Sequence, residues 1–412
     1  MSGPLSQPAR LGPPGFHRGV LLPSLFLLVA MLNLTLIVAG LRELVIDELG
    51  GTSRDAGLFF SIEMAAYIVF APLWGLLSDR LGRRRPFVIS GFLLSAALYA
   101  AYAMVDSVPL LLGLRFVQGA ASVMAWSTLM AMVVDAADGA RRGRWLGLMG
   151  GSLMLGVSLG APLGGYVSRH LGARGPLEVA AVLFLIIGLG SLGLREPASL
   201  RRQTALREVL GALRARPGLL VPYAFYFVDR YTVGILVVLL PLYLGSLGAD
   251  PALRGRYLAV FLLPFALLQY FTGRASERTG PYAPLLLGSL LYGVALCFVG
   301  FSGLHGLWYV MAALGVLAAI MFPPTLVLTA ELSEPATRGS AMGGFNLAGS
   351  VGFAIGPVAG VAIGERYGTG AAFVSAGSLE IVAVVVAAAL LLGARRRRHS
   401  PPEIRPSPGG QA

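Results

Sequence analysis

Twelve long apolar segments, separated by short polar breaks, run along the 412 residues of this chain. A helix of about 20 apolar residues spans the hydrocarbon core of a bilayer, so each segment is long enough to cross a membrane. Hydrophobic residues make up 56% of the chain and charged residues only 13%, against about 25% charged residues in soluble proteins. This pattern predicts an all-α integral membrane protein. The expected transmembrane helices cover residues 20–42, 56–77, 86–105, 108–134, 145–167, 177–194, 219–244, 255–272, 283–301, 306–330, 340–363 and 371–393.

Arginine supplies every basic side chain, since the 32 Lys+Arg residues include no lysine. With the N-terminus inside, 23 arginines fall in cytoplasmic segments and 7 on the other side. Cytoplasmic loops are enriched in positive charge, so this distribution predicts a cytoplasmic N-terminus, and an even number of helices returns the C-terminus to the same side. The formal charge of +12 follows from this bias, and no nucleic-acid partner is expected. We expect a multi-pass protein of the bacterial cytoplasmic (inner) membrane.

A polar stretch from Arg195 to Gly218 divides the chain near its middle. We expect a cytoplasmic linker there that contains a short amphipathic helix at the membrane interface. The predicted organisation is a cytoplasmic N-terminal tail (1–19), an N-terminal six-helix bundle (20–194), the linker (195–218), a C-terminal six-helix bundle (219–394) and a disordered, Pro-rich cytoplasmic tail (395–412).

Three sequence landmarks recur at nearly constant offsets in the two halves of the chain. The first set recurs 198 positions later, with Gly75, Asp79, Arg80 and Gly82 matched by Gly273, Glu277, Arg278 and Gly280. The second and third sets recur 196 positions later. In the second set, Asp135, Arg142 and Gly143 are matched by Glu331, Arg338 and Gly339. In the third set, Gly156, Gly160 and Gly164 are matched by Gly352, Gly356 and Gly360. A parallel repeat of half the chain predicts two pseudo-symmetric six-helix bundles, an organisation found in transporters.

Catalytic and metal-binding chemistry has little support in the sequence. The single cysteine, Cys297, and four scattered histidines supply neither an intramolecular disulfide nor a metal cluster. No nucleophile–base set stands out, and the G-x-x-x-x-G-K-[ST] loop of nucleotide-driven pumps is absent. We therefore expect no enzyme activity, no catalytic residues, no cofactor and no metal.

The loop after the second expected helix resembles the signature of the major facilitator superfamily. Residues Gly75 to Arg84 match the pattern G-x-L-x-D-R-x-G-R-R. In the fourth helix, Arg115-x-x-Gln118-Gly119 resembles a motif of the twelve-helix drug–proton antiporter branch. The resemblance covers essentially the whole chain and implies the major facilitator fold.

Two departures from the antiporter branch stand in the N-terminal half. The fifth helix carries Ala161-Pro162 where that branch has Gly-Pro, whereas the eleventh helix keeps Gly356-Pro357. The branch's acidic residue in the first helix is also missing, and Asn33 and Thr35 are the polar residues there. These departures weaken the antiporter assignment and argue against a proton site in the first helix.

The resemblance implies that the signature loop braces a cytoplasmic gate. Asp79 would accept hydrogen bonds from the free backbone N–H groups at the start of the eleventh helix, near Gly339. Arg83 or Arg84 would pair with Asp135 at the end of the fourth helix. The alternative is a plain positively charged cytoplasmic loop. The full set of gate candidates is Gly75, Asp79, Arg80, Gly82, Arg83, Arg84, Asp135, Glu277, Arg278, Glu331 and Arg338.

Small residues repeat every fourth position in the fifth and eleventh helices, which places them on one helix face where backbones can approach closely. Two interpretations stay open, a sliding interface between the halves and static helix packing. The candidates are Gly156, Gly160, Pro162, Gly164, Gly352, Gly356, Pro357 and Gly360.

Ionisable groups inside the membrane cost at least about 2.5 kcal/mol each and are functional candidates. Glu63 lies about 24 Å and Arg115 about 30 Å from the cytoplasmic ends of their helices at a rise of 1.5 Å per residue. This similar depth favours Glu63 with Arg115 as the proton-coupling pair. Each has a structural alternative, a water-exposed rim carboxylate for Glu63 and bonds to backbone carbonyls for Arg115.

Asp229 and Arg230 in the seventh helix are further proton-coupling candidates. Adjacent helical residues point about 100° apart, so we do not expect these two to pair with each other. Aromatic residues nearby could stack on a cationic ligand or serve ordinary packing. The candidates for the substrate cavity are Asn33, Thr35, Gln118, Tyr226 and Tyr231. Glu380 in the last helix has no assigned role.

The expected function is proton-coupled efflux, or antiport, of a small amphipathic or cationic compound by alternating access. Two alternatives stay open: proton-coupled uptake of a nutrient or metabolite by a symporter, and a non-transporting membrane receptor on the same fold. The expected partners are a small-molecule substrate, protons and the lipid bilayer, and we expect a monomer.

Overall fold

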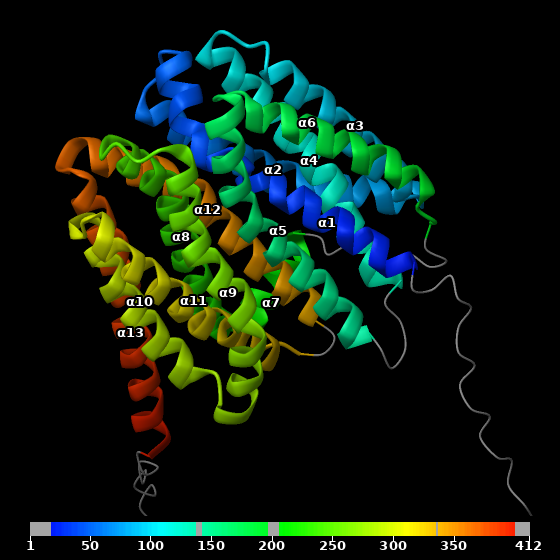
Figure 1. The fold of residues 1–412 in the computed structure, drawn as a ribbon. Coiled ribbons are helices and arrows are strands. Elements are labelled where there is room, and N and C mark those ends of the chain that lie inside the picture. Colours follow the sequence, from blue (N-terminus) through cyan, green and yellow to red (C-terminus); the bar gives the residue numbers. More distant parts are fainter. Residues whose placement is uncertain (1–17, 137–141, 197–205, 335–336, 400–412) are drawn as a thin grey trace, which may run out of the picture.

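The computed structural model describes residues 18–136, 142–196, 206–334 and 337–399, and within them every regular element is a helix (Figure 1). Twelve helices are long and apolar enough to cross a membrane. They form two six-helix halves, α1–α6 and α8–α13, so the predicted fold class is confirmed. The twelve are α1 (Arg18–Leu36), α2 (Ser53–Leu81), α3 (Arg85–Tyr102), α4 (Val108–Ala136), α5 (Arg142–Leu171), α6 (Gly175–Gly190), α8 (Leu220–Ser246), α9 (Pro251–Thr279), α10 (Tyr282–Phe298), α11 (Leu304–Leu332), α12 (Arg338–Tyr367) and α13 (Thr369–His399).

Helix ends differ from the sequence expectation where local chemistry overrides hydrophobicity. The first expected helix ran to residue 42, but α1 ends at Leu36 and irregular helical turns follow. Helix α2 begins three residues before the expected position because Thr52 caps it. The Thr52 amide donates to Asp55 Oδ2 at 2.7 Å, and the Asp55 amide donates to Thr52 Oγ1 at 3.3 Å, which is a capping box. The last helix continues beyond the expected residue 393, to His399.

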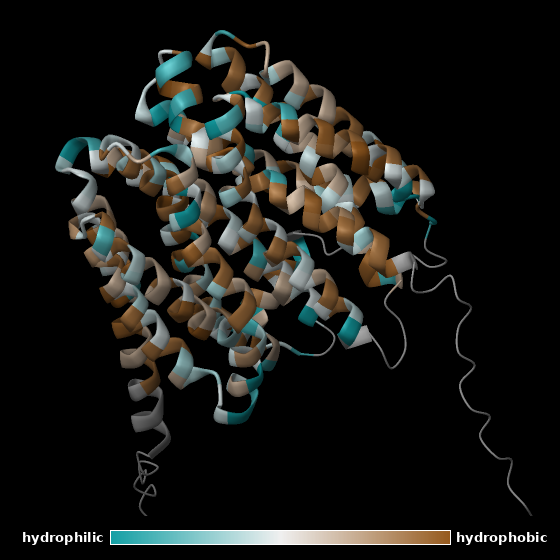
Figure 2. Cartoon of the chain, viewed as in Figure 1, coloured by the Kyte–Doolittle hydropathy of each residue, from teal (hydrophilic) through white to brown (hydrophobic). Residues whose placement is uncertain are grey.

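The outer faces of the helices are apolar, as Figure 2 shows, while many hydrophilic residues lie near the helix ends. Large hydrophobic side chains such as Ile186 and Val385 are 58% and 60% exposed. Exposed apolar surface of this extent is unfavourable in water and favourable against lipid tails. The surface therefore agrees with a multi-pass membrane protein.

The two halves contact each other at one end of the bundle, called here the far end. The near end is the one at which α1 begins and α13 ends. Three ion pairs cross between the halves at the far end: Arg54–Glu365 at 2.5 Å, Arg169–Asp250 at 3.4 Å and Arg254–Glu43 at 2.7 Å.

Helix packing at the interface also changes from the far end to the near end. A Cβ atom at Gly255 of α9 would lie only 2.5 Å from the carbonyl oxygen of Ala161 in α5. Toward the near end, a Cβ atom at Gly147, Gly150 or Gly151 of α5 would meet no atom within 4 Å. The halves are therefore closely packed at the far end, and α5 has open space beside it toward the near end.

The internal repeat appears in equivalent close contacts. Between the halves, Gly57 of α2 approaches Pro357 of α12, and its counterpart Gly255 approaches Ala161. Within the halves, the carbonyl oxygen of Glu63 would lie 3.1 Å from a Cβ atom at Gly119. The equivalent distance from Phe261 to Gly315 is 2.3 Å. The repeated sequence thus encodes repeated backbone contacts.

The glycine stripes of α5 and α12 pack inside each half and do not form the sliding interface that was one of the two expectations. A Cβ atom at Gly156, Gly160 or Gly164 would lie within 2.2 Å of a carbonyl oxygen of α1. Likewise, Gly352 and Gly356 lie against carbonyl oxygens of α8, and Gly360 lies against Ile235. The static-packing interpretation is the correct one for these glycines. The prolines differ, since Pro162 and Pro357 lie against Gly255 and Gly57 of the opposite half.

A short helix in the linker, α7 (Leu206–Ala215), matches the expected amphipathic helix. Its Val209 and Ala212 are buried, and it packs against α12. Just after it, Arg216 pairs with Glu334 at 2.7 Å. The interfacial location of α7 stays a prediction, and the N-terminal tail up to residue 17 and the last residues, 400–412, lie outside the described residues.

Candidate functional site

Glu63 of α2 and Arg115 of α4, which similar depth favoured as a pair, form a buried ion pair in the N-terminal half. Arg115 Nη2 donates to Glu63 Oε2. The Glu63 side chain is 1% exposed and the Arg115 side chain is 0% exposed. The hydroxyl of Tyr67, one turn further along α2, donates to Glu63 Oε1 at 2.9 Å. Both carboxylate oxygens of Glu63 are therefore occupied, so the rim-carboxylate alternative is wrong.

Every nitrogen of the Arg115 guanidinium has a partner. Nη1 donates to Gln118 Oε1 at 2.8 Å and to the hydroxyl of Tyr99 at 3.0 Å. Nε donates to the carbonyl oxygen of Phe59 at 3.4 Å, and the Phe59 ring lies 4.2 Å from the guanidinium carbon. The structural alternative for Arg115, a bond to a backbone carbonyl, is thus present together with the ion pair.

This N-terminal cluster is electrically balanced. One carboxylate and one guanidinium sum to zero charge, which offsets the cost of placing either group in the membrane interior. Two polar atoms beside the pair, Gln118 Nε2 and the Tyr102 hydroxyl, have no hydrogen-bond partner among the described residues. The cluster therefore has spare hydrogen-bonding capacity but no excess charge.

Asp229 and Arg230 of α8 pair with each other, so the expectation that they do not pair was wrong. Arg230 Nε donates to Asp229 Oδ2 at 2.8 Å, and Nη2 lies 2.7 Å from the same oxygen. The 100° step between adjacent residues separates their Cβ atoms, but the long arginine side chain curls back across it. The exposed fractions of the two side chains are 5% and 17%.

Three aromatic rings surround the Arg230 guanidinium. Its central carbon lies 5.3 Å from the ring of Tyr226, 5.4 Å from Phe322 and 5.9 Å from Phe265. Tyr226 is itself stacked on Phe345 at 4.0 Å. Aromatic faces attract cations, so these rings from α8, α9 and α11 form a place where positive charge is stabilised beside a carboxylate.

The other cavity candidates are taken up by packing. Thr35 is 3% exposed, and its hydroxyl donates to the carbonyl oxygen of Val157 at 2.8 Å, which joins α1 to α5. Asn33 is fully buried and donates to its own helix, while its Oδ1 has no partner among the described residues. Tyr231 stacks on Phe227.

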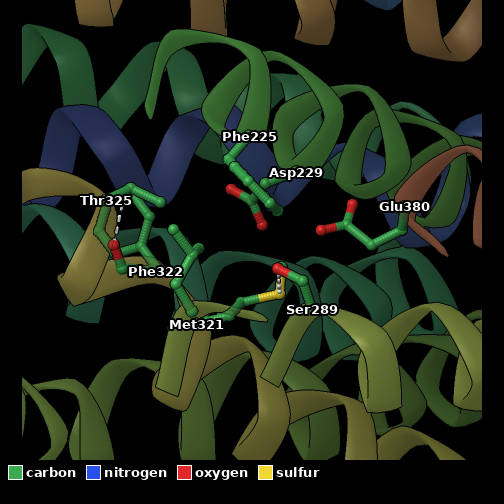
Figure 3. A pocket seen from close by; sticks show the side chains of 8 residues that line it. Phe225, Asp229, Ser289, Met321, Phe322, Thr325 and Glu380 are labelled. Atoms are coloured by element: carbon green, nitrogen blue, oxygen red, sulfur yellow. Dashed lines mark hydrogen bonds between the residues drawn. The ribbon is translucent and has the colours of Figure 1, made fainter. Parts of the chain in front are cut away.

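A pocket inside the C-terminal half contains two acidic side chains (Figure 3). The carboxyl groups of Asp229 and Glu380 point toward each other across it, from α8 and α13. Sequence reasoning gave Glu380 no role, although a lone acid in a long apolar segment was a usable signal. The pocket is lined by Phe225, Asp229, Leu285, Ser289, Met321, Phe322, Thr325 and Glu380.

The expected pairing of the signature loop with the fourth helix is confirmed. Arg84, which is 1% exposed, lies 2.9 Å from Asp135 of α4 and 3.3 Å from Asp79 of α2. The backbone amides of Arg84 and Arg85 donate to Glu196 at 2.5 Å and 3.0 Å. Sequence reasoning missed Glu196, which follows α6 and ties its end to the start of α3.

The glycines of the loop have clear structural roles. Gly82 ends α2 with φ of 63°, a conformation that other residues rarely adopt, and Gly75 is buried. The remaining candidates are exposed, and the described part of the chain shows no ion pair at any of them. They are Arg80, Arg83, Glu277, Arg278, Glu331 and Arg338. The expected capping of α12 by Asp79 stays a prediction.

Two related six-helix halves, each with a buried pair of opposite charges, are an arrangement typical of membrane transporters. The comparisons with known proteins agree. The model of the Major Facilitator Superfamily matches residues 24–228 and 223–411, and the chain belongs to this family.

Two groups of relatives are about a quarter identical to the chain over the aligned residues. The human synaptic vesicular amine transporter is 26% identical over 325 residues, which cover 76% of this chain and 62% of the relative. The chain therefore spans less than two thirds of the length of that transporter. The multidrug resistance protein MdtH of Salmonella paratyphi C is 24% identical over 319 residues, covering 76% of this chain and 79% of the relative.

Solved structures share the fold at lower identity. A bacterial homolog of the human lysosomal transporter Spinster, in an inward-facing and unoccupied conformation, matches 95% of this chain and 100% of its own with a TM-score of 0.75 and 15% identity. A mutant of the nucleoside transporter NupG matches 91% of this chain and 99% of its own with a TM-score of 0.76 and 13% identity. These matches establish the fold alone.

Proposed function

We propose that this transporter exports a small cationic or amphipathic compound in exchange for protons. The observation that carries the proposal is the cluster around Arg230, where three aromatic rings and the Asp229 carboxylate surround a positive charge in the membrane interior. Rings and a carboxylate are the groups that bind an organic cation. The printed names of the relatives, amine transporters and a multidrug resistance protein, support the same substrate class.

The near end is proposed to face the cytoplasm, because 23 arginines fall on that side and 7 on the other. The conformation described here is then closed to the outside and separated at the cytoplasmic end. Alternating access requires the far-end ion pairs to break while the near end closes. Two of these pairs, Arg54–Glu365 and Arg169–Asp250, have side chains that are each at least 33% exposed, and exposed pairs contribute only about 0–1 kcal/mol each. Their opening is therefore compatible with a transport cycle.

Closure of the near end is proposed to use the signature loop. In the present conformation Arg84 holds Asp79 and Asp135 together inside one half. When the halves approach at this end, Asp79 would accept hydrogen bonds from the free amides at the start of α12. These hydrogen bonds would then stabilise the outward-open state, and they would break when the protein returns to the conformation described here.

Proton coupling is proposed to involve Glu63 and Arg115. Arginine keeps its charge because its pKa exceeds about 12, so Glu63 must be the group that changes protonation. While Arg115 contacts Glu63, the carboxylate is stabilised in its charged form. Rocking that separates the two would favour proton uptake by Glu63, and renewed contact would favour release.

The test is transport by purified protein in proteoliposomes with an imposed pH gradient. Tetraphenylphosphonium, which is permanently charged, and phenethylamine are the probes. Proton-coupled antiport predicts that either probe accumulates against its gradient while protons move the opposite way. Movement of protons and probe in the same direction would indicate a symporter, and binding without gradient-driven flux would indicate a receptor. Both results contradict the proposal.

A further inference from the structure

Glu380 lies in the pocket between α8, α10, α11 and α13 and has no partner for its charge. Its side chain is 0% exposed, and neither carboxyl oxygen has a hydrogen-bond partner among the described residues. Across the pocket, Asp229 Oδ1 is also without a partner, because Arg230 contacts only Oδ2. Three buried acceptor oxygens thus lack a donor where two carboxyl groups face each other (Figure 3).

The charges that face this pocket come from few elements. Helix α8 contributes Asp229 and Arg230, α13 contributes Glu380, and α10 contributes the titratable hydroxyl of Tyr292, which lies beside Thr232 of α8. The residues that α11 contributes to the lining are uncharged. With both acids ionised, two negative charges and one positive charge leave a net charge of −1 in the membrane interior.

Binding of one proton would remove both the excess negative charge and the lack of a hydrogen-bond donor. It neutralises the excess charge, and a protonated carboxyl group supplies the O–H donor that the facing oxygens lack. A metal cation fits less well, since cations such as Ca²⁺ take 6–8 oxygen ligands. Among the pocket hydroxyls, Ser289 Oγ donates to Met321 Sδ at 3.6 Å and also lies beside the Glu380 carboxyl group, whereas Thr325 Oγ1 donates to the Phe322 carbonyl oxygen at 2.6 Å.

We propose that Glu380 and Asp229 form a proton-binding site in which Glu380 carries the proton while Asp229 pairs with Arg230. Its role in coupling rests on the proposed function. A cationic substrate that enters beside the rings around Arg230 adds one positive charge. Glu380 then releases its proton, so the carboxyl group becomes a carboxylate and the net charge stays zero before and after the exchange. The site would thus exchange one proton for one monovalent cation.

The proton itself can be tested without substrate. Infrared spectra of the purified protein in liposomes at neutral pH report the C=O stretch of protonated carboxyl groups. We expect one component of this band to be lost in Glu380→Gln and kept in Glu178→Gln, a matched change at an exposed acid. In Asp229→Asn the Glu380 component should weaken at the same pH, because Arg230 is then free to pair with an ionised Glu380.

Two results would overturn the proton site. One is a wild-type spectrum from which Glu380→Gln removes nothing, since Glu380 would then be ionised. The other is loss of the component when sodium replaces choline at constant pH, since that would identify a metal-cation site. Because Glu380→Gln could also fail to fold, Glu380→Asp, which keeps the acid, should retain a carboxyl band, and its absence from folded protein contradicts the assignment.

Coupling is tested by proton release when tetraphenylphosphonium binds in weakly buffered detergent solution. The wild type should release protons, and Glu380→Gln should bind the probe without that release. Equal release by both proteins would overturn the role of Glu380 in exchange. Failure of the wild type to bind or transport either probe would count against the proposed function, whereas the infrared result would still decide the proton site.

Discussion

Removing the charge of Glu63 should destabilise the protein more than removing the charge of Arg115. In Glu63→Gln, Arg115 stays charged and 0% exposed, with its neutral partners but no carboxylate. Breaking a buried pair in this way costs about 3–5 kcal/mol. In Arg115→Gln, Glu63 can take up a proton and keep its contact with Tyr67, so the cost falls to about 1–3 kcal/mol for the lost hydrogen bonds.

The assay uses the single native cysteine. Cys297 is partly buried between α10 and α13, so a thiol-reactive dye reports its exposure on heating. The expected order of midpoints is wild type, then Arg115→Gln, then Glu63→Gln. The double variant should recover part of the loss because no unpaired charge remains. Equal losses in the two single variants, or a double variant as unstable as the sum of both, would refute the reasoning.

Three other changes test topology, gating and coupling. Single cysteines at Thr52 and Gly218, with Cys297 replaced, should be labelled from opposite sides of the membrane. Equal labelling from outside would contradict the assigned orientation. Asp79→Asn should insert normally but transport much more slowly, because it removes the charge that we propose to cap α12. Full transport would reduce the loop to a topology signal. Glu63→Gln should lose accumulation driven by a pH gradient in proteoliposomes but keep downhill exchange. Retained accumulation would exclude Glu63 as a coupling residue and leave Glu380 as the proposed proton carrier.

Features that depend on position along one helix were predictable from the sequence. The twelve spans follow from apolar length, and the repeat follows from constant offsets. The contact of Glu63 with Arg115 was inferred from the depth of each residue below the end of its helix, and the ion pair bears this out. The pairing of Arg84 with Asp135 came from the resemblance of the signature loop and is present at 2.9 Å.

Features that depend on side-chain reach or on which helices are neighbours were not predictable. Helix geometry places Asp229 and Arg230 on different faces, but it does not describe how far an arginine side chain can fold back. Glu380 gains significance only because α13 packs against α8 and α10, which no spacing in the sequence indicates. The glycine stripes identified close packing correctly, but the identity of the partner helix came only from the structure.

The distribution of charge, and not the packing, distinguishes the two halves. Both halves repeat the same glycine contacts, including the inter-half pairs Gly57–Pro357 and Gly255–Ala161, so both contribute equivalent surfaces to the contact between the halves. The buried acids are not repeated, because Phe261 occupies the position equivalent to Glu63. The N-terminal pair is neutral without a proton, whereas the C-terminal cluster needs one to be neutral. If the C-terminal cluster stays neutral through the cycle, a cation can enter that half only as a proton leaves it. We infer that the excess acid couples substrate binding in this half to proton release, in addition to the protonation change proposed for Glu63, while the repeated packing contributes equally from both halves to the contact between them.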